Sequence, residues 1–372
     1  MEEPLLPPNL FRTPPGLPFE GFIGTFMGRD ALGALPSVLK LQHQDSVLLP
    51  AYLCGEVVKP FLGRNSVEFY DIGEDLVVDP QYLEERLVTS KAKAVLIINY
   101  FGFLQPFRSE IKEICHKRGA LLIEDCAHSL LTAGSGIVGD ITIYSLRKHL
   151  PLPDGGGLKI AHKEQSVPID FHSRFRSNTF SLLSSLKSIL RLNIAGLSRS
   201  GLSRQSPQSC GDVKPVSAAL KRKVLPISTF AYNGFGNADL KAVYARCRTD
   251  YDFWQKKTAD FGKFFQPLFP ELASGVCPLG FPLVAQERTT IKERFAAGGI
   301  HLKVYWKLPP AVPSHFAMSQ KLAAQVFTLP IYPDLRPGQR EKITKILESI
   351  ASIPRSSRAD ALASSPRLAS RT

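Results

Sequence analysis

Short apolar runs alternate with helical patterns through the first half of the chain, and this alternation limits the folds open to it. Residues 106–119 illustrate the helical pattern, because Ile111, Ile114 and Cys115 share one face before Gly119. Continuous apolar strands joined by amphipathic helices favour a mostly parallel sheet sandwiched between helices, so we predict an α/β fold. The expected strands are residues 46–50, 67–72, 94–101, 120–127 and 141–146.

The second half predicts a smaller C-terminal α+β domain. A long helical pattern over 237–261 precedes a mixture of short apolar runs and two further helical patterns, at 288–300 and 337–350. The predicted divisions are an N-terminal extension 1–24, a large α/β domain 25–236 that includes a basic variable insertion 172–224, a small domain 237–354, and a disordered basic tail 355–372.

The net charge of +13 is concentrated in two segments, 172–224 and 355–372, so the remainder is nearly neutral. No zinc-finger or RNA-binding motif accompanies this charge, and we expect no nucleic-acid partner. Within the basic insertion, residues 181–192 have a helical apolar face. Three interpretations stay open: a packed helix, an electrostatic funnel for a phosphorylated substrate, or a membrane-surface helix, which is the least favoured.

Cysteine spacing and the N-terminal sequence bear on metal sites and cellular location. The six cysteines are scattered without a CxxC pair, which argues against a zinc site or a disulfide framework, so no metal is expected. The N-terminus is acidic and proline-rich, unlike a signal peptide, and no apolar run is long enough to span a membrane. We therefore predict a cytoplasmic protein.

Polar residues follow two of the expected strands. Asp125 and His128 come at the end of one strand, and Ser145 and Lys148 at the end of the next, before the glycines of "DGGGL". Carboxyl ends of parallel strands line the ligand crevice of such sheets, where a lysine amine can condense with a carbonyl group. A lysine in a loop is otherwise a solvated surface residue, and the glycines alone fit any turn.

Taken in order, these motifs resemble the DegT/DnrJ/StrS-type sugar aminotransferases, pyridoxal-phosphate enzymes of the aspartate aminotransferase fold (fold type I). The resemblance runs from about Gly28 to Ile350 and includes "GRDAL", "VLLPAYLCGEVVKPFL", "HKRGALLIEDCAHS", "GDITIYSLRKHLPLPDGGGL" and "FTLPIYPDL". The stretches around "EDCAH" and from "GD" to "DGG" are its most specific parts.

The resemblance implies two catalytic residues. Asp125 would pair with the pyridine nitrogen of the cofactor, and Lys148 would hold the cofactor as a Schiff base and then move the substrate proton. His128 would bind near the ring substituents, although a core histidine is the alternative. Glu124 must point to the opposite face of its strand and is expected to be structural.

For the cofactor phosphate, the resemblance implies a helix N-terminus containing Gly28, Arg29 and Asp30, with Ser145 adding a hydroxyl. Tyr52 is the aromatic candidate for stacking on the cofactor ring, and Cys54 is the alternative. Asn233 would reach the phosphate of a neighbouring subunit, because the relatives are homodimers.

The predicted function is a pyridoxal-phosphate-dependent aminotransferase, which moves an amino group from glutamate to a keto sugar, nucleotide-linked by analogy. The family pattern is shortened here, since only two residues separate Ser145 from Lys148 and His149 follows the lysine. Two alternatives remain: a pyridoxal-phosphate sugar dehydratase, and a non-catalytic binding protein on the same fold.

Overall fold

The structure is a computed structural model that describes residues 21–161, 224–261 and 264–352. The predicted insertion 172–224, except Val224, the tail 355–372 and most of the extension 1–24 therefore lie outside the described residues. Seven strands form the main sheet: β1 Phe22–Thr25, β2 Ser46–Pro50, β3 Ser66–Tyr70, β4 Ala94–Ile98, β5 Leu121–Asp125, β6 Ile141–Ser145 and β7 Gly156–Ile160.

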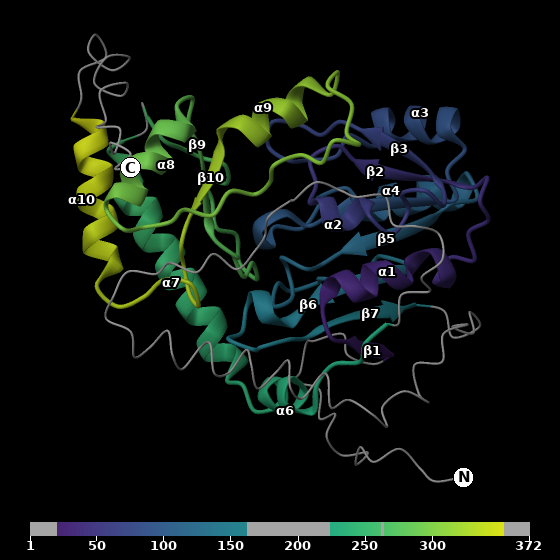
Figure 1. Cartoon of the computed structure of the whole chain (residues 1–372), viewed down its shortest axis with the longest axis horizontal. Helices are drawn as coiled ribbons and strands as arrows, with labels where there is room; N and C mark the ends of the chain where they lie inside the picture. The colour runs from purple at the N-terminus through teal and green to yellow at the C-terminus, as the bar shows by residue number, and fades with distance from the viewer. Residues whose placement is uncertain (1–20, 162–223, 262–263, 353–372) are drawn as a thin grey trace, which may run out of the picture.

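The sheet has the strand order β1-β7-β6-β5-β4-β2-β3 (Figure 1). Five of its seven strands, in the order β3, β2, β4, β5 and β6, pair in parallel. Strand β7 is antiparallel to both β6 and β1. Every residue of β2, β4 and β6 is buried, which explains their uninterrupted apolar sequences. The prediction of a mostly parallel α/β sheet is confirmed, and each of the five predicted strands is present.

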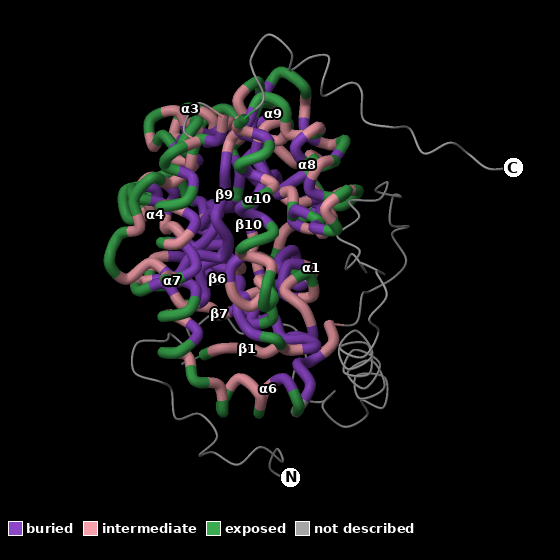
Figure 2. Tube along the Cα trace, turned by 90° about the vertical axis from the view of Figure 1, so that its left-hand side faces the viewer, coloured by how far each residue is buried: buried purple, intermediate pink, exposed green. Residues whose placement is uncertain are grey.

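Helices cover both faces of this sheet. They are α1 Gly28–Val38, α2 Gly55–Val58, α3 Pro80–Ser90 and α4 Arg108–Lys117. Figure 2 shows α3 and α4 on one side of the buried strands and α1 on the other. Local sequence starts α3, because Asp79 accepts hydrogen bonds from the backbone N–H groups of Gln81 and Tyr82 and Pro80 occupies the first turn.

A second, three-stranded sheet in the order β10-β9-β8 belongs to the C-terminal part, together with its own buried core. The predicted small α+β portion is confirmed as a fold class, while its boundaries at 237 and 354 stay a prediction. Its elements are α7 Leu240–Ala259, β8 Gln266–Pro267, β9 Phe281–Val284, α8 Arg288–Ala297, α9 Ala317–Gln325, β10 Val326–Leu329 and α10 Gln339–Ala351, preceded by α6 Thr229–Gly236. None of these described helices is long and apolar enough to cross a membrane.

Asp71 ties the two parts together. It follows β3, and its carboxylate accepts hydrogen bonds from the backbone nitrogens of Met318, at 3.2 Å, and Ser319, at 3.0 Å, in the first turn of α9. A carboxylate at a helix N-terminus is stabilised by the exposed N–H groups and the helix dipole. The ion pair between Lys321 and Glu74, at 2.8 Å, adds a surface contact beside it. This anchor holds the segment that precedes α9 against the main sheet.

Gly156 allows β7 to pack directly on the start of α1. A Cβ atom at this position would lie 2.2 Å from the backbone nitrogen of Gly28, a distance that real Cβ atoms do not tolerate. The middle of the three glycines of "DGGGL", Gly156, is therefore required by close backbone packing. This packing fixes the first turn of α1 beside the end of β6.

Gly156→Ala is expected to lower the free energy of unfolding by about 1–3 kcal/mol, because the added methyl group overpacks rigid backbone. Urea unfolding measures the effect. Gly33→Ala is the matched control, since a Cβ there meets no atom within 4 Å and alanine favours the helix. That control should leave stability unchanged or raise it by up to about 1 kcal/mol. Equal stabilities for the two variants would refute the close-packing argument.

Candidate active site

Asp125 lies at the carboxyl end of β5, near the middle of the parallel sheet. It is 6% exposed, and the backbone N–H of Ala127 donates a hydrogen bond to its Oδ1 at 2.9 Å. Burial raises the pKa of Asp125, and the charge of Lys148 and this hydrogen bond oppose the rise. The sheet therefore presents a desolvated carboxylate whose charge needs a cationic neighbour.

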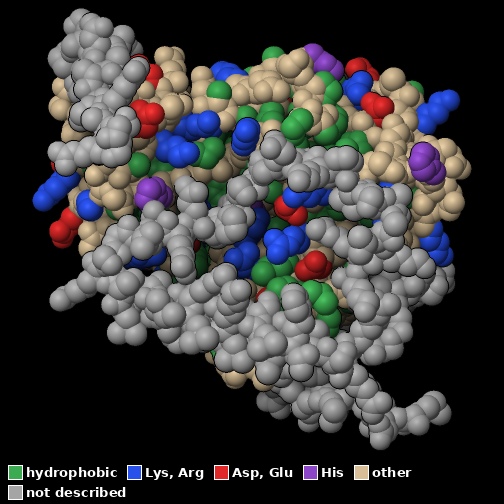
Figure 3. Space-filling view, viewed as in Figure 1, with side chains coloured by type: hydrophobic (Ala, Val, Ile, Leu, Met, Phe, Trp, Pro, Cys, Tyr) green, Lys and Arg blue, Asp and Glu red, His purple; other side chains and the backbone are tan. Residues whose placement is uncertain are grey.

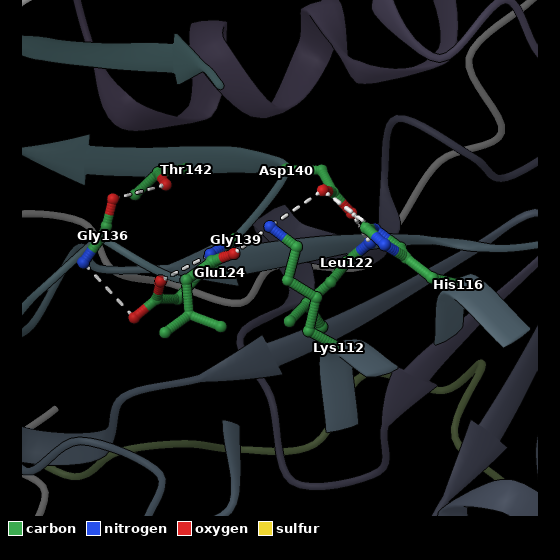
Figure 4. Close-up of polar contacts among 9 residues, drawn as sticks. Lys112, His116, Leu122, Glu124, Gly136, Gly139, Asp140 and Thr142 are labelled. Carbon is green, nitrogen blue, oxygen red and sulfur yellow. Dashed lines mark hydrogen bonds and ion pairs between the residues drawn. The ribbon is translucent and has the colours of Figure 1, made fainter. Parts of the chain in front are cut away.

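Glu124 has a different environment, as expected from strand alternation. Its buried carboxylate accepts a hydrogen bond from the side chain of Asn99 at 2.9 Å. It also accepts hydrogen bonds from the backbone nitrogens of Gly136 and Gly139, at 3.3 and 3.0 Å (Figure 4). These donors belong to loops next to β4 and β6. Glu124 is thus a structural residue that holds two loops to the sheet.

Asp140 forms the other polar centre in Figure 4. It accepts hydrogen bonds from Leu122 N, at 2.8 Å, and His116 Nε2, at 2.9 Å, and pairs with Lys112 at 3.2 Å. Burial raises the pKa of Asp140, but these three donors outweigh it, so the net shift is downward. Asp125 and Asp140 are therefore carboxylates whose pKa values move in opposite directions within one sheet.

Lys148 ends the short 3-10 turn η3 (Leu146–Lys148) that directly follows β6. Burial lowers the pKa of Lys148, the charges of Asp125 and Cys54 raise it, and those of Arg147 and Lys303 lower it again. The net shift is downward, which increases the fraction of neutral amine at neutral pH. A lowered pKa is what a lysine needs in order to act as a nucleophile.

His128 follows the end of β5 by three residues and is 2% exposed. The backbone N–H of Phe101 donates to its Nδ1 at 3.3 Å, so a neutral ring carries its proton on Nε2. Nε2 is buried and has no hydrogen-bond partner among the described residues. Burial, followed by the charge of Lys148, holds the pKa of His128 well below its ordinary value of 6.5. The site thus contains a neutral imidazole with one unused donor.

An aromatic wall closes this part of the site; we use the term for Tyr52, Tyr100, Phe101, Tyr305 and Trp306. The ring centroid of Trp306 lies 5.3 Å from that of His128 and 5.4 Å from that of Tyr52, and Tyr305 lies 5.3 Å from His128. Tyr305 and Trp306 belong to the segment anchored by Asp71. The C-terminal part therefore supplies one side of a site whose floor is the main sheet.

The start of α1 lies beside the end of β6. A Cβ on Gly28 would be 3.5 Å from the Cβ of Ser145, while Arg29 extends as an exposed side chain from the same turn. The carboxylate of Asp30 accepts a hydrogen bond from Met27 N at 2.9 Å, so Asp30 helps to cap its own helix. Gly28 and Ser145 are thus brought together with the first turn of the helix, as a phosphate site requires.

The other predicted residues occupy separate positions. Tyr52 is fully buried in the aromatic wall, and burial strongly raises its pKa. Cys54, the alternative stacking residue, is half-buried and close enough to Lys148 to affect its pKa. Asn233 is exposed on α6, which Figure 1 shows near β1 at the edge of the main sheet. The roles of all three residues stay predictions.

Several residues of the site carried no signal in the sequence. Tyr305 and Trp306 lie far along the chain in "HLKVYW", an ordinary apolar run. Lys303 precedes them and pairs with Asp334, close enough to Lys148 and His128 to lower the pKa of each. Only the fold brings this segment to the carboxyl edge. Alignment of "HLKVYW" with the sequences of relatives is the signal that could have pointed to this segment.

Comparison with known proteins finds a family similarity in the first half of the chain. Residues 23–165 match the model of the DegT/DnrJ/EryC1/StrS aminotransferase family. This part of the chain is similar to that family. The match covers the main sheet with Asp125, His128 and Lys148, and it agrees with the resemblance read from the sequence motifs.

Individual relatives are distant. The chain is 27% identical over 144 residues to a GDP-perosamine synthase from Vibrio cholerae, which covers 37% of this chain and 39% of that protein. It is 22% identical to a UDP-N-acetyl-3-dehydro-alpha-D-glucosamine 3-aminotransferase from Acidithiobacillus ferrooxidans, over 87% and 83% of the two chains. The solved structure of NtdA from Bacillus subtilis with bound cofactor PMP superposes with a TM-score of 0.60 at 17% identity, covering 89% of this chain and 73% of that one. This solved structure shares the fold of the chain.

Asp125→Asn tests the buried charge. A carboxyl whose pKa is raised on folding stabilises the fold only while protonated, and this contribution is lost as pH rises from about 3.8 through the folded-state pKa. The asparagine of the variant does not ionise, so the variant does not lose stability in this way. The free energy of unfolding of the variant, relative to that of the wild type, is therefore expected to increase from acidic to neutral pH. Thermal unfolding of the cofactor-free protein at several pH values measures this.

Asp140→Asn is the matched control with the opposite sign. The lowered pKa of Asp140 adds stability above its ordinary value, and this is lost as pH falls through the folded-state pKa. The control variant should therefore be less stable than the wild type at neutral pH, with a deficit that shrinks in acid. Parallel pH profiles for the two variants would contradict the assignment of opposite shifts.

Proposed function

We propose that this protein is a pyridoxal-phosphate-dependent aminotransferase acting on a keto sugar. The observation that carries the proposal is the meeting of Asp125, His128 and Lys148 at the carboxyl edge of the main sheet. Their opposed pKa shifts, raised for Asp125 and lowered for Lys148, are characteristic of acid–base and nucleophilic sites. The similarity of residues 23–165 to an aminotransferase family supports the same interpretation.

The residues present fit pyridoxal phosphate. The unused Nε2 donor of His128 suits a ring hydroxyl, and the buried carboxylate of Asp125 suits a protonated pyridine nitrogen. The bound cofactor supplies an electron-accepting ring, which stabilises negative charge that develops on the substrate carbon. Asp125 would hold the proton on the ring nitrogen, because its own charge is desolvated and otherwise costly.

Lys148 would attach the cofactor and carry the substrate proton at Nζ. Its lowered pKa keeps part of the amine neutral, and the neighbouring Asp125 carboxylate stabilises the protonated form when the proton arrives. The aromatic wall excludes water from this side, since Tyr305 and Trp306 are 4% and 9% exposed. The arrangement would thus bring a base, an acid and a wall that excludes water to one place.

The substrate proposal rests on the relatives. One is named for synthesis of a GDP-linked amino sugar and another for amination of a UDP-linked keto sugar. We propose a nucleotide-linked keto sugar as acceptor and glutamate as donor, in a ping-pong reaction with two half-reactions. We further propose a cytoplasmic homodimer in which Asn233 serves the neighbouring subunit's site.

The decisive experiment compares absorption spectra of wild type and Lys148→Ala with added pyridoxal phosphate, before and after glutamate. The wild type should give a cofactor band that glutamate bleaches, and borohydride reduction should leave the pyridoxyl mass on Lys148. The Lys148→Ala variant should lose the bleaching and at least about 100-fold in amino transfer. Lys345→Ala, an exposed lysine on α10, is the matched control and should behave as wild type.

Three other results would redirect the proposal. A band that glutamate leaves unchanged would favour a dehydratase. Absence of any band in the wild type would favour a binding protein on the same fold. A pyridoxyl mass on another lysine would refute the role of Lys148 while keeping the cofactor.

A further inference from the structure

Lys303 and Asp334 form an ion pair beside the aromatic wall, and this pair has no role in the site described above. Their side chains are 45% and 41% exposed, so the pair faces solvent. The C-terminal sheet fixes the position of Lys303, because its carbonyl oxygen accepts a hydrogen bond from Thr328 N in β10 at 3.0 Å. A turn fixes Asp334, since its backbone nitrogen donates to Ile331 O at 2.8 Å. Both charged side chains therefore extend from well-held backbone.

The chain connects this pair directly to the active site. Tyr305 follows Lys303 by two residues, so their Cα atoms are at most about 7 Å apart. The ring centroid of Tyr305 lies 5.3 Å from that of His128. Burial is the main cause of the lowered pKa of both His128 and Lys148, and the charge of Lys303 adds to each shift. Figure 3 shows Lys and Arg side chains next to acidic and hydrophobic ones in the middle of the viewed face. Lys303 is thus a cation at the exposed edge of the site.

The pair can open at little cost. Partial burial lowers the pKa of Lys303, but the phenol of Tyr305 and the carboxylate of Asp334 raise it, and the net shift is upward. Lys303 therefore stays cationic at neutral pH and needs an anion beside it. An exposed ion pair contributes little to stability, because water screens it and two long side chains must be held in one geometry. A second carboxylate can therefore replace Asp334 at Lys303.

The proposed reaction has a use for such an exchangeable cation. Glutamate carries a side-chain carboxylate, whereas the ring carbons around the keto group of a sugar carry neutral hydroxyl groups, and both substrates use one site in turn. A cation left without a partner would be costly beside the sugar, and a missing cation would leave the carboxylate of glutamate unpaired. A lysine that exchanges a carboxylate of the protein for one of the substrate meets both requirements.

We propose that Lys303 selects the amino donor by binding its side-chain carboxylate, which displaces Asp334 from the ion pair. This rests on the proposed function. The donor nitrogen must reach Lys148, which is half-buried, whereas Lys303 is exposed, so the cation lies toward the outer end of a bound donor. The α-carboxylate is bonded directly to the reacting carbon, and the side-chain carboxylate lies further out. When the pair with Asp334 forms again, the same edge of the site is neutral and suits the sugar.

The first test measures how fast each donor bleaches the cofactor band of the full chain, loaded with pyridoxal phosphate, in a single turnover. L-glutamate and L-glutamine are compared, because they differ only by a carboxylate or an amide at the end of the side chain. Lys303→Met should lower the apparent second-order rate constant for glutamate by about 10- to 100-fold, as expected for a lost hydrogen bond between charged groups. The constant for glutamine should change by less than about twofold. Lys303→Arg should recover part of the loss.

Binding without reaction gives a second readout. Glutarate has two carboxylates and no amine, and glutaramate has an amide in place of one carboxylate. Calorimetric titration of the loaded wild type should show tighter binding of glutarate, and Lys303→Met should remove the difference between the two ligands. Asp334→Asn removes the competing carboxylate of the protein, so it should tighten glutarate binding by up to about fivefold.

Lys321→Met is the matched control, because Lys321 also forms a surface ion pair, with Glu74 at 2.8 Å, and its side chain is 44% exposed. It should leave the reaction of both donors and the binding of both ligands unchanged. Equal weakening of glutamate and glutamine by Lys303→Met would overturn the proposal, because it indicates a structural role. A wild type that reacts equally with the two donors, or an unchanged preference in Lys303→Met, would also overturn it and leave the proposed function intact. Absence of bleaching by either donor would refute the proposed function itself, and the role of Lys303 with it.

Discussion

Parallel pairing of β4, β5 and β6 is the constraint on which the site depends. The register aligns Ile98 with Asp125 and Asp125 with Ile143, so the three strands end at one edge within a residue or two of each other. The chain leaves each strand at this edge, and the residues that follow meet there whatever their separation in sequence. Asp125, His128 and Lys148 share a site for this reason.

The cost of this arrangement is the desolvation of charge. Asp125 and Lys148 are each driven toward their neutral forms by burial, and each partly restores the other's charge. His128 avoids the cost by staying neutral, with Nδ1 accepting a backbone hydrogen bond. A site of this kind is less stable than an apolar core of the same volume, and it is kept ready for a ligand that completes the missing contacts.

The sequence was sufficient for the parallel strands of the main sheet, because their apolar runs are continuous and three of them, β2, β4 and β6, are fully buried. β2 and β6 illustrate this, since neither contains an exposed residue. Asp125 and Lys148 could also be proposed, because each directly follows such a run. β1 and β7 were missed because glycines dilute their apolar pattern, and Gly156 is required by the approach of α1 rather than by strand propensity. Tyr305 and Trp306 were missed because tertiary packing alone carries them to the site.

The anchor at Asp71 has a consequence for the order in which the molecule is completed. Its partner Met318 lies 247 residues further along the chain. A ribosome releases the sheet with Asp125 and Lys148 well before it releases α9, so the wall of Tyr305 and Trp306 arrives last. The nascent protein therefore has an open crevice for a period of its synthesis, and long-range docking of α9, with its large loop-closure cost, finishes the enclosure.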